Sequence, residues 1–216
     1  VGETLLQMTF KRFESICPIE NIYIVTSRLY KDLVLEQLPM VNPDCVITEP
    51  IRRNTAPCIA YANAKIKKRN PNAKIVLHGI SMGAATIMMA TGSVEIPSNV
   101  VAAIEDCGFT SVIDEFGFQI KQRIGIEARL LIKASSIYAK IKAGFFYGEN
   151  SPIEAIKRSK IPTLFIHGST DDFVPFYMLQ ELYDSASCPK EILVIENAEH
   201  VMSHIVDPDK YWSTVD

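Results

Sequence analysis

The residue best suited to chemistry in this sequence is Ser81, in the stretch Gly79–Gly83 (GISMG). An apolar run at 74–78 precedes it and an Ala-rich helical stretch at 82–91 follows it, which is the strand, turn and helix order of a G-x-S-x-G nucleophile elbow. Such a turn strains the serine and projects its hydroxyl from the sheet edge, and small residues at 79 and 83 let strand and helix approach. The alternative is a tight strand-to-helix turn capped by Ser81.

Two later segments offer an acid and a base. Asp171 and Asp172 follow a strand predicted at 162–167, and His200 follows a strand predicted at 191–196. An aspartate just beyond the carboxyl end of a strand can orient a catalytic histidine, although the surroundings of Asp172 equally permit a helix N-cap. Both aspartates therefore remain candidates from the residues alone.

The other histidines and Cys107 fit structural roles better. His78 and His167 end predicted strands, where a histidine more often makes structural hydrogen bonds than acts as a base. His204 is interpreted as a surface or helix residue. Cys107 is most simply a small buried residue at a strand end.

These residue types predict acyl transfer to a serine. His200 would take the proton of Ser81 so that the hydroxyl can attack an acyl carbon, and the aspartate would fix the imidazole tautomer. The backbone amide of Met82 would donate one hydrogen bond to the developing oxyanion.

Hydrophobic periodicity alternates between strand and helix, which predicts an α/β fold. The expected form is a single three-layer sandwich around one six-stranded, mostly parallel sheet, with residues 1–216 in one domain. The segment 117–152 is the least regular, at a place where a cap is often inserted. Strands are expected at 21–27, 44–49, 74–78, 100–105, 162–167 and 191–196, and helices at 4–17, 30–38, 55–69, 82–91, 111–142, 177–185 and 208–215.

Composition excludes several partner classes. The net charge of −3 gives no field for nucleic acid or anionic membranes, and no apolar run approaches the length of a membrane span. The basic run from Lys65 to Arg69 is interpreted as a solvated helix end. The five cysteines are scattered, so neither a disulfide framework nor a metal site is expected, and no cofactor is predicted. We expect a cytoplasmic, soluble chain with a cut or engineered start, because it opens without methionine or a signal pattern.

The carboxyl-terminal two thirds resembles the bacterial α/β-hydrolases related to serine esterases and peptidases. The resemblance rests on AKIVLHGISMGAATIMMATG, AAIEDCGFTSVIDEF, PTLFIHGSTDDFVPF, NAEH and DPDKYW. Its HGxxDxxVP pattern implies that Asp171, rather than Asp172, is the triad acid. The family's first two strands, its His-Gly loop and its D-x-R-G-x-G segment have no counterpart here.

Residues 1–74 instead resemble mannose-1-phosphate guanylyltransferases. The resemblance rests on TLLQMTFKRFESICPIENIYIVTS and EPIRRNTAPCIAYANAKIKKRNPNAKIV. That family's phosphate loop and metal-binding motif are missing, so Arg52, Arg53 and Asn54 are interpreted as a solvated loop. The two resemblances together imply a recombined or artificial chimera whose sheet has the strand order 2-1-3-4-5-6.

The leading functional hypothesis is a serine hydrolase of small carboxylic esters with weak or no activity. Activity is expected to be low because the second oxyanion donor of the hydrolases would come from a loop that is here replaced by 26–29. The alternatives are a chimeric scaffold without biological function and, disfavoured, a remnant of a nucleotide-sugar transferase. One contiguous core is expected to bury Leu5, Phe10, Ile24, Val25, Val46, Ile47, Ile59 and Ile66.

Overall fold

The computed structural model describes residues 2–14, 17–49, 55–93, 96–127, 129–149 and 151–215. The chain divides into two compact units, Val1–Ala73 and Lys74–Asp216. Among the described residues, no helix combines the length and the apolar character needed to cross a membrane.

The first unit is a small α/β structure with its own core. Strands β1 (Ile24–Ser27) and β2 (Val46–Glu49) pair in parallel, with Ile24 opposite Val46. Apolar side chains from the helices and loops of this unit gather around Phe10 and Leu38, which are almost fully buried. The helices are α1 (Leu5–Glu14), η1 (Ile19–Asn21), η2 (Arg28–Tyr30), α2 (Lys31–Gln37), η3 (Pro43–Cys45) and α3 (Thr55–Arg69).

The second unit is built on a four-stranded parallel sheet in the order β3-β4-β5-β6. Because all strands run in the same direction, their carboxyl ends meet at one edge of the sheet, where ligands and catalytic groups gather in folds of this class. The four strands are β3 (Ile75–Ile80), β4 (Val100–Asp106), β5 (Thr163–Gly168) and β6 (Lys190–Ile195).

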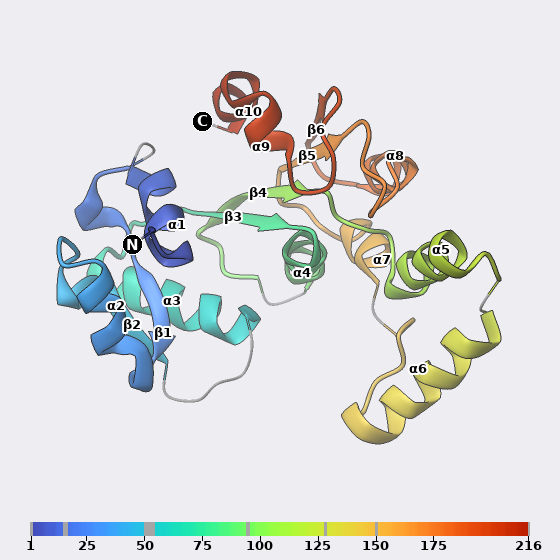
Figure 1. The fold of residues 1–216 in the computed structure, drawn as a ribbon, viewed down its shortest axis with the longest axis horizontal. Helices are drawn as coiled ribbons and strands as arrows, with labels where there is room; N and C mark the ends of the chain where they lie inside the picture. The colour runs from blue at the N-terminus through green and yellow to red at the C-terminus, as the bar shows by residue number, and fades with distance from the viewer. Residues whose placement is uncertain are drawn as a thin grey trace. The chain divides into compact units, whose positions relative to one another are not determined.

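Helices cover both faces of this sheet (Figure 1). On one face, α4 (Met82–Thr91), α7 (Pro152–Ile156) and α8 (Tyr177–Ser185) bury Phe165 of β5. On the other face, α10 (Pro208–Val215) packs its Tyr211 against Ile166, the next residue of β5. Neighbouring residues of a strand point to opposite faces, so a doubly covered parallel strand reads as the continuous apolar run seen at LFI. The short helix α9 (Ser203–Val206) precedes α10.

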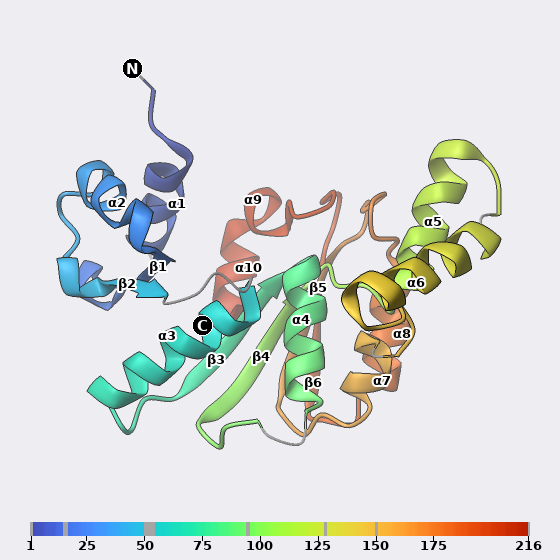
Figure 2. The ribbon, with the colours of Figure 1, turned by 90° about the horizontal axis from the view of Figure 1, so that it is seen from below.

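A helical pair extends away from the sheet at the place predicted for a cap (Figure 2). It consists of α5 (Val112–Ile124) and α6 (Arg129–Ala143). Ser111 caps α5 by accepting a hydrogen bond from the Asp114 backbone N–H at 3.0 Å. Gly125 ends α5 in the left-handed conformation with φ 76°.

The predicted α/β class is confirmed, whereas the single six-stranded sheet is wrong. In the described part of the chain, β1 and β2 form a sheet of their own and β3 begins a second sheet. The strands β1 and β2 are only four residues long, and their apolar side chains already serve the core of the first unit. The expectation of one folding domain stays a prediction.

The core predicted for the first 74 residues is only partly right. Phe10, Val46 and Ile47 are buried, but Leu5 is 76% exposed. Residues 24, 25 and 66 are half-buried, and the side chain of residue 59 lies outside the described ones. An apolar pattern identifies the face of an element, whereas what covers that face depends on tertiary packing.

Candidate active site

Ser81 lies in a strained turn between β3 and α4. Its backbone has φ 56° and ψ −116°, an unfavourable conformation for a residue with a side chain. A Cβ on Gly79 would lie 2.3 Å from the Gly83 carbonyl carbon, so only glycine allows the turn to close there. A Cβ on Gly83 would meet nothing within 4 Å, so the expected steric need for a small residue holds at position 79 and not at position 83.

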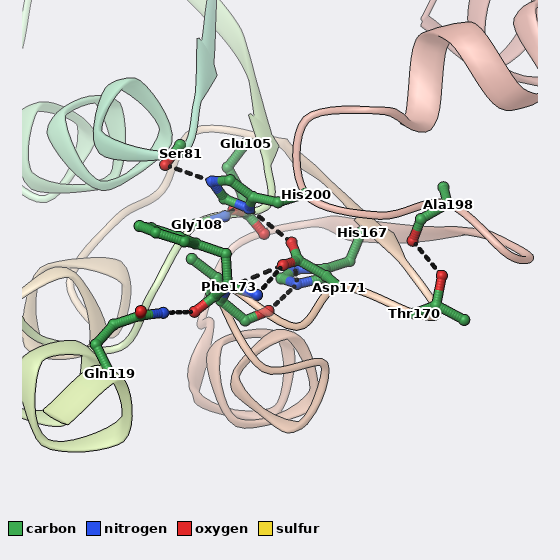
Figure 3. Close-up of polar contacts among 11 residues, drawn as sticks. Ser81, Glu105, Gly108, Gln119, His167, Thr170, Asp171, Phe173, Ala198 and His200 are labelled. Carbon is green, nitrogen blue, oxygen red and sulfur yellow. Dashed lines mark hydrogen bonds and ion pairs between the residues drawn. The ribbon is translucent and has the colours of Figure 1, made fainter. Parts of the chain in front are cut away.

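The Ser81 side chain does not cap the helix that it precedes. Its Oγ lies 3.0 Å from Nε2 of His200, and Nδ1 of His200 lies 2.8 Å from Oδ2 of Asp171 (Figure 3). The structure therefore brings together the predicted nucleophile, base and acid, and the alternative of a capped turn is wrong. His200 stands between the other two, from the segment after β6.

The Asp171 carboxylate is held by four contacts. Its Oδ1 accepts hydrogen bonds from the backbone N–H groups of Phe173 at 3.0 Å and Val174 at 2.9 Å, and its Oδ2 faces His200 and His167. Burial alone would raise the pKa of Asp171, but the hydrogen bonds from His167, His200 and Val174 outweigh it and hold that pKa well below its usual range. Asp171 is therefore an anion at neutral pH.

This hydrogen-bonded chain leaves out Asp172 and two of the histidines, His78 and His204. Asp172 is exposed, and His200 contacts Asp171 instead. His78 contacts the Tyr211 hydroxyl at 3.0 Å, and the His204 ring meets the Tyr211 ring edge to face. Both histidines have structural surroundings, as their positions in the sequence predict.

Because ionised Asp171 can only accept, His200 must donate to it through Nδ1–H. That tautomer leaves a lone pair on Nε2, which can accept the Ser81 proton. The side chain of His200 is 18% exposed, so the base can be reached from solvent.

The segment that carries His200 is itself strained. Val201, the next residue, has φ 66°, and Asn197 has φ 60°. A positive φ is a genuine outlier for a β-branched residue such as valine. Such strain is retained where the surrounding structure enforces it, often at functional sites.

Phe173 belongs to the site, although the sequence analysis did not identify it. Its ring lies 4.8 Å from the His200 ring, centre to centre, with 30° between the planes. Gln119 of α5 donates a hydrogen bond to the Phe173 carbonyl, so the cap helix fastens this segment (Figure 3). Its position in the sequence, two residues after Asp171, could have indicated this role, because residues of that turn lie at the same edge of the sheet.

Met82, the predicted oxyanion donor, is the first residue of α4. The first N–H groups of a helix have no partner within the helix and carry the positive end of its dipole. The Met82 amide is therefore suited to stabilise an anion beside Ser81. Of the residues expected to replace the second donor loop, Ser27 ends β1 and Arg28 begins η2 in the other unit.

Cys107 adds a thiol to the group. Ligand atoms of Cys107, Asp171 and His200 all lie within 4.8 Å of one another, an arrangement that could hold a metal ion. Burial raises the pKa of the Cys107 thiol, and the facing atoms of Asp171 and His200 are already bonded to each other. A metal would therefore have to remove the thiol proton and break the His200–Asp171 hydrogen bond.

Two acids at the carboxyl end of β4 are fully buried. Burial raises the pKa of Glu105 to about 8, against a hydrogen bond from the Gly108 N–H that lowers it. Burial likewise raises the pKa of Asp106 to about 6, although Asp106 accepts a hydrogen bond from the Tyr211 hydroxyl. Glu105 is therefore largely protonated at neutral pH.

Comparison with known families decides the relationship. A family model described as serine hydrolase (FSH1) matches residues 45–213. The chain belongs to this family. The FSH1 match begins within the segment that resembles guanylyltransferases, and these comparisons support neither a guanylyltransferase segment nor a chimeric origin. Arg52, Arg53 and Asn54 lie outside the described residues.

This FSH1-family chain is shorter than the two relatives described next. It is 29% identical over 148 residues to the uncharacterized protein YqkD of Bacillus subtilis, a match that covers 68% of this chain and 48% of the relative. It is 29% identical over 113 residues to the uncharacterized protein YfhR of Escherichia coli, covering 49% of this chain and 39% of the relative. The chain thus spans less than half the length of these relatives.

Solved structures show the same fold. An esterase of Pyrococcus furiosus is 21% identical with a TM-score of 0.53, and the match covers 79% of this chain and 64% of that one. An acylaminoacyl peptidase of Pyrococcus horikoshii is 18% identical with a TM-score of 0.51, covering 73% of this chain and 26% of that one. At these identities the FSH1-family chain shares the fold with both.

Proposed function

We propose that this chain hydrolyses small carboxylic esters, with Ser81 as nucleophile, His200 as general base and Asp171 as the orienting acid. The single observation that carries the proposal is the hydrogen-bonded chain from Ser81 Oγ through the His200 ring to Asp171. The strained turn at Ser81 supports it, because the side chain there points at a base and not at the helix backbone.

The reaction takes place in two halves. His200 Nε2 takes the Ser81 proton as Oγ bonds to the ester carbonyl carbon, and the carbonyl electron pair moves onto oxygen beside the Met82 amide. The bond to the alkoxy group then breaks, and His200 protonates the departing alcohol. Water repeats the sequence on the acyl-serine, which releases the carboxylic acid and returns the proton to Ser81.

The expected rate is low, because the loop that gives the second oxyanion donor in the resembled hydrolases is replaced here by residues 26–29. Loss of one oxyanion donor lowers kcat by about 10²–10³. We assign a small ester or acyl compound as the substrate, and we assign no nucleic acid or membrane partner. We assign residues 1–74 no nucleotide chemistry, so GTP with Mg²⁺ should leave the melting temperature unchanged.

Hydrolysis of p-nitrophenyl acetate tests the proposal. Wild-type turnover should be measurable but well below the ~10 s⁻¹ of a median enzyme. Ser81→Ala should remove all of it, while Ser213→Ala, at an exposed serine of α10, should change nothing. Equal rates in wild type and Ser81→Ala would overturn the proposal.

A further inference from the structure

His167 is fully buried at the end of β5 and contacts both sides of the turn that carries Asp171. Its Nε2 lies 2.9 Å from the carbonyl oxygen of Val174 and 3.3 Å from Oδ2 of Asp171. Phe176 packs edge to face on the His167 ring at 5.9 Å. The ring is therefore fixed in place by packing and by two polar contacts.

The partners of Nε2 determine the tautomer of His167. A carbonyl oxygen and a carboxylate can only accept hydrogen bonds, so Nε2 must carry the proton. Nδ1 has no hydrogen-bond partner among the described residues. With the proton on Nε2 the unpartnered atom is a lone pair, whereas the other tautomer would leave a buried N–H unpaired and aim a lone pair at two oxygens.

The turn is closed from both sides by these contacts. Asp171 accepts the N–H of Val174 at 2.9 Å, while His167 donates to the carbonyl of the same Val174. His167 and His200 face the same oxygen of Asp171. A change at His167 must therefore affect both the position of Asp171 and the electron density that Oδ2 offers to His200.

We propose that His167 is a positioning residue that donates an Nε2–H hydrogen bond shared between Val174 and Asp171 and thereby sets how strongly Asp171 binds His200. The proposal rests on the function proposed above. His167 does not touch the reacting atoms, since Asp171 and His200 separate it from Ser81 (Figure 3).

Removing this donor should strengthen the hydrogen bond that the Nδ1–H of His200 donates to Asp171. Asp171 Oδ2 would then accept from His200 without a competing donor, and an undivided charged acceptor makes the stronger hydrogen bond. Three other titratable groups interact with His200. The Cys107 thiol lies within 4.8 Å of it, and the carboxyl groups of Asp106 and Glu115 interact with it electrostatically. None of these three is changed by a substitution at His167.

Histidine NMR on the intact chain tests the proposal without requiring turnover. The chain has 4 histidines, so selective ¹⁵N labelling gives a simple spectrum. In wild type at pH 8, His167 should carry its proton on Nε2, with no proton on Nδ1. His167→Phe, which keeps a ring against Phe176, should move the Nδ1–H proton signal of His200 downfield, as a stronger hydrogen bond to Asp171 does. His167→Gln, whose amide N–H can occupy the Nε2 position, should return it toward the wild-type value.

Each outcome decides the question. An unchanged Nδ1–H signal of His200 in folded His167→Phe, or no recovery in His167→Gln, would overturn the proposal. If neither variant folds, the wild-type tautomer decides, since an Nδ1–H form of His167 contradicts it. If the NMR results are as expected but the wild-type protein is inactive, the proposed ester hydrolysis is contradicted and the role of His167 is not.

Discussion

Ser81 and His200 are 119 positions apart in the chain, yet Oγ of one lies 3.0 Å from Nε2 of the other. Their strands, β3 and β6, are the two outer strands of the four-stranded sheet. The segment after β6 must therefore reach back over the carboxyl ends of β5 and β4, and it does so with positive φ at Asn197 and Val201. This reach places the base beside the nucleophile.

The two neighbouring aspartates should differ sharply in their effect on the rate. Asp171→Asn keeps an oxygen for the Phe173 and Val174 amides but can present an N–H to His200, which favours the wrong tautomer. We expect kcat for p-nitrophenyl acetate to fall by about 10³–10⁴. Asp172→Asn is the matched control, and it should stay near wild type because Asp172 is exposed. Equal losses in both variants would contradict the assignment of the acid.

The two glycines of the turn should respond oppositely to alanine. Gly79→Ala places a Cβ at 2.3 Å from backbone atoms of Gly83, so it should destabilise the fold by about 3 kcal/mol or more. Gly83→Ala has open space and lies within α4, so its free energy of unfolding should change by less than about 1 kcal/mol. Urea denaturation of both variants checks this, and a tolerated Gly79→Ala would show that the turn can relax.

Glu105 should make the protein less stable as pH rises. The folded state keeps Glu105 protonated up to about pH 8, whereas the unfolded chain loses that proton near pH 4.5. The folded state thus binds more protons between these values, and the free energy of unfolding falls through this window by a few kcal/mol at most. Glu105→Gln mimics the protonated form, so its stability should fall less between pH 5 and pH 9. Parallel pH profiles of the two proteins would refute the buried-acid assignment.

Most of the site could be predicted from the sequence. Ser81, Asp171 and His200 each follow a strand that is recognisable from its apolar run, and parallel strands bring their carboxyl ends to one edge. Pattern alone could not separate Asp171 from Asp172, because adjacent residues of a turn differ only in the direction of their side chains. Phe173 was missed for the same reason.

The pairing of the sheet could not be obtained in this way. Whether β1 pairs with β3 depends on contacts between distant segments, whereas the hydrophobic period reports only which face of each strand is covered. The positive φ of Val201 also could not be predicted from the sequence, since valine rarely adopts a left-handed conformation. The shared hydrogen bond of His167 depends on distances of about 3 Å that no spacing rule supplies.

Labelling with a fluorophosphonate probe tests the central claim most directly, because the probe reacts much faster with an activated serine hydroxyl than with an ordinary one. We predict one probe per chain, mapped by peptide mass spectrometry to Ser81, with no labelling of Ser81→Ala and slower labelling of Asp171→Asn. Labelling that persists in Ser81→Ala, or a folded wild type that the probe leaves unmodified, would contradict the central claim.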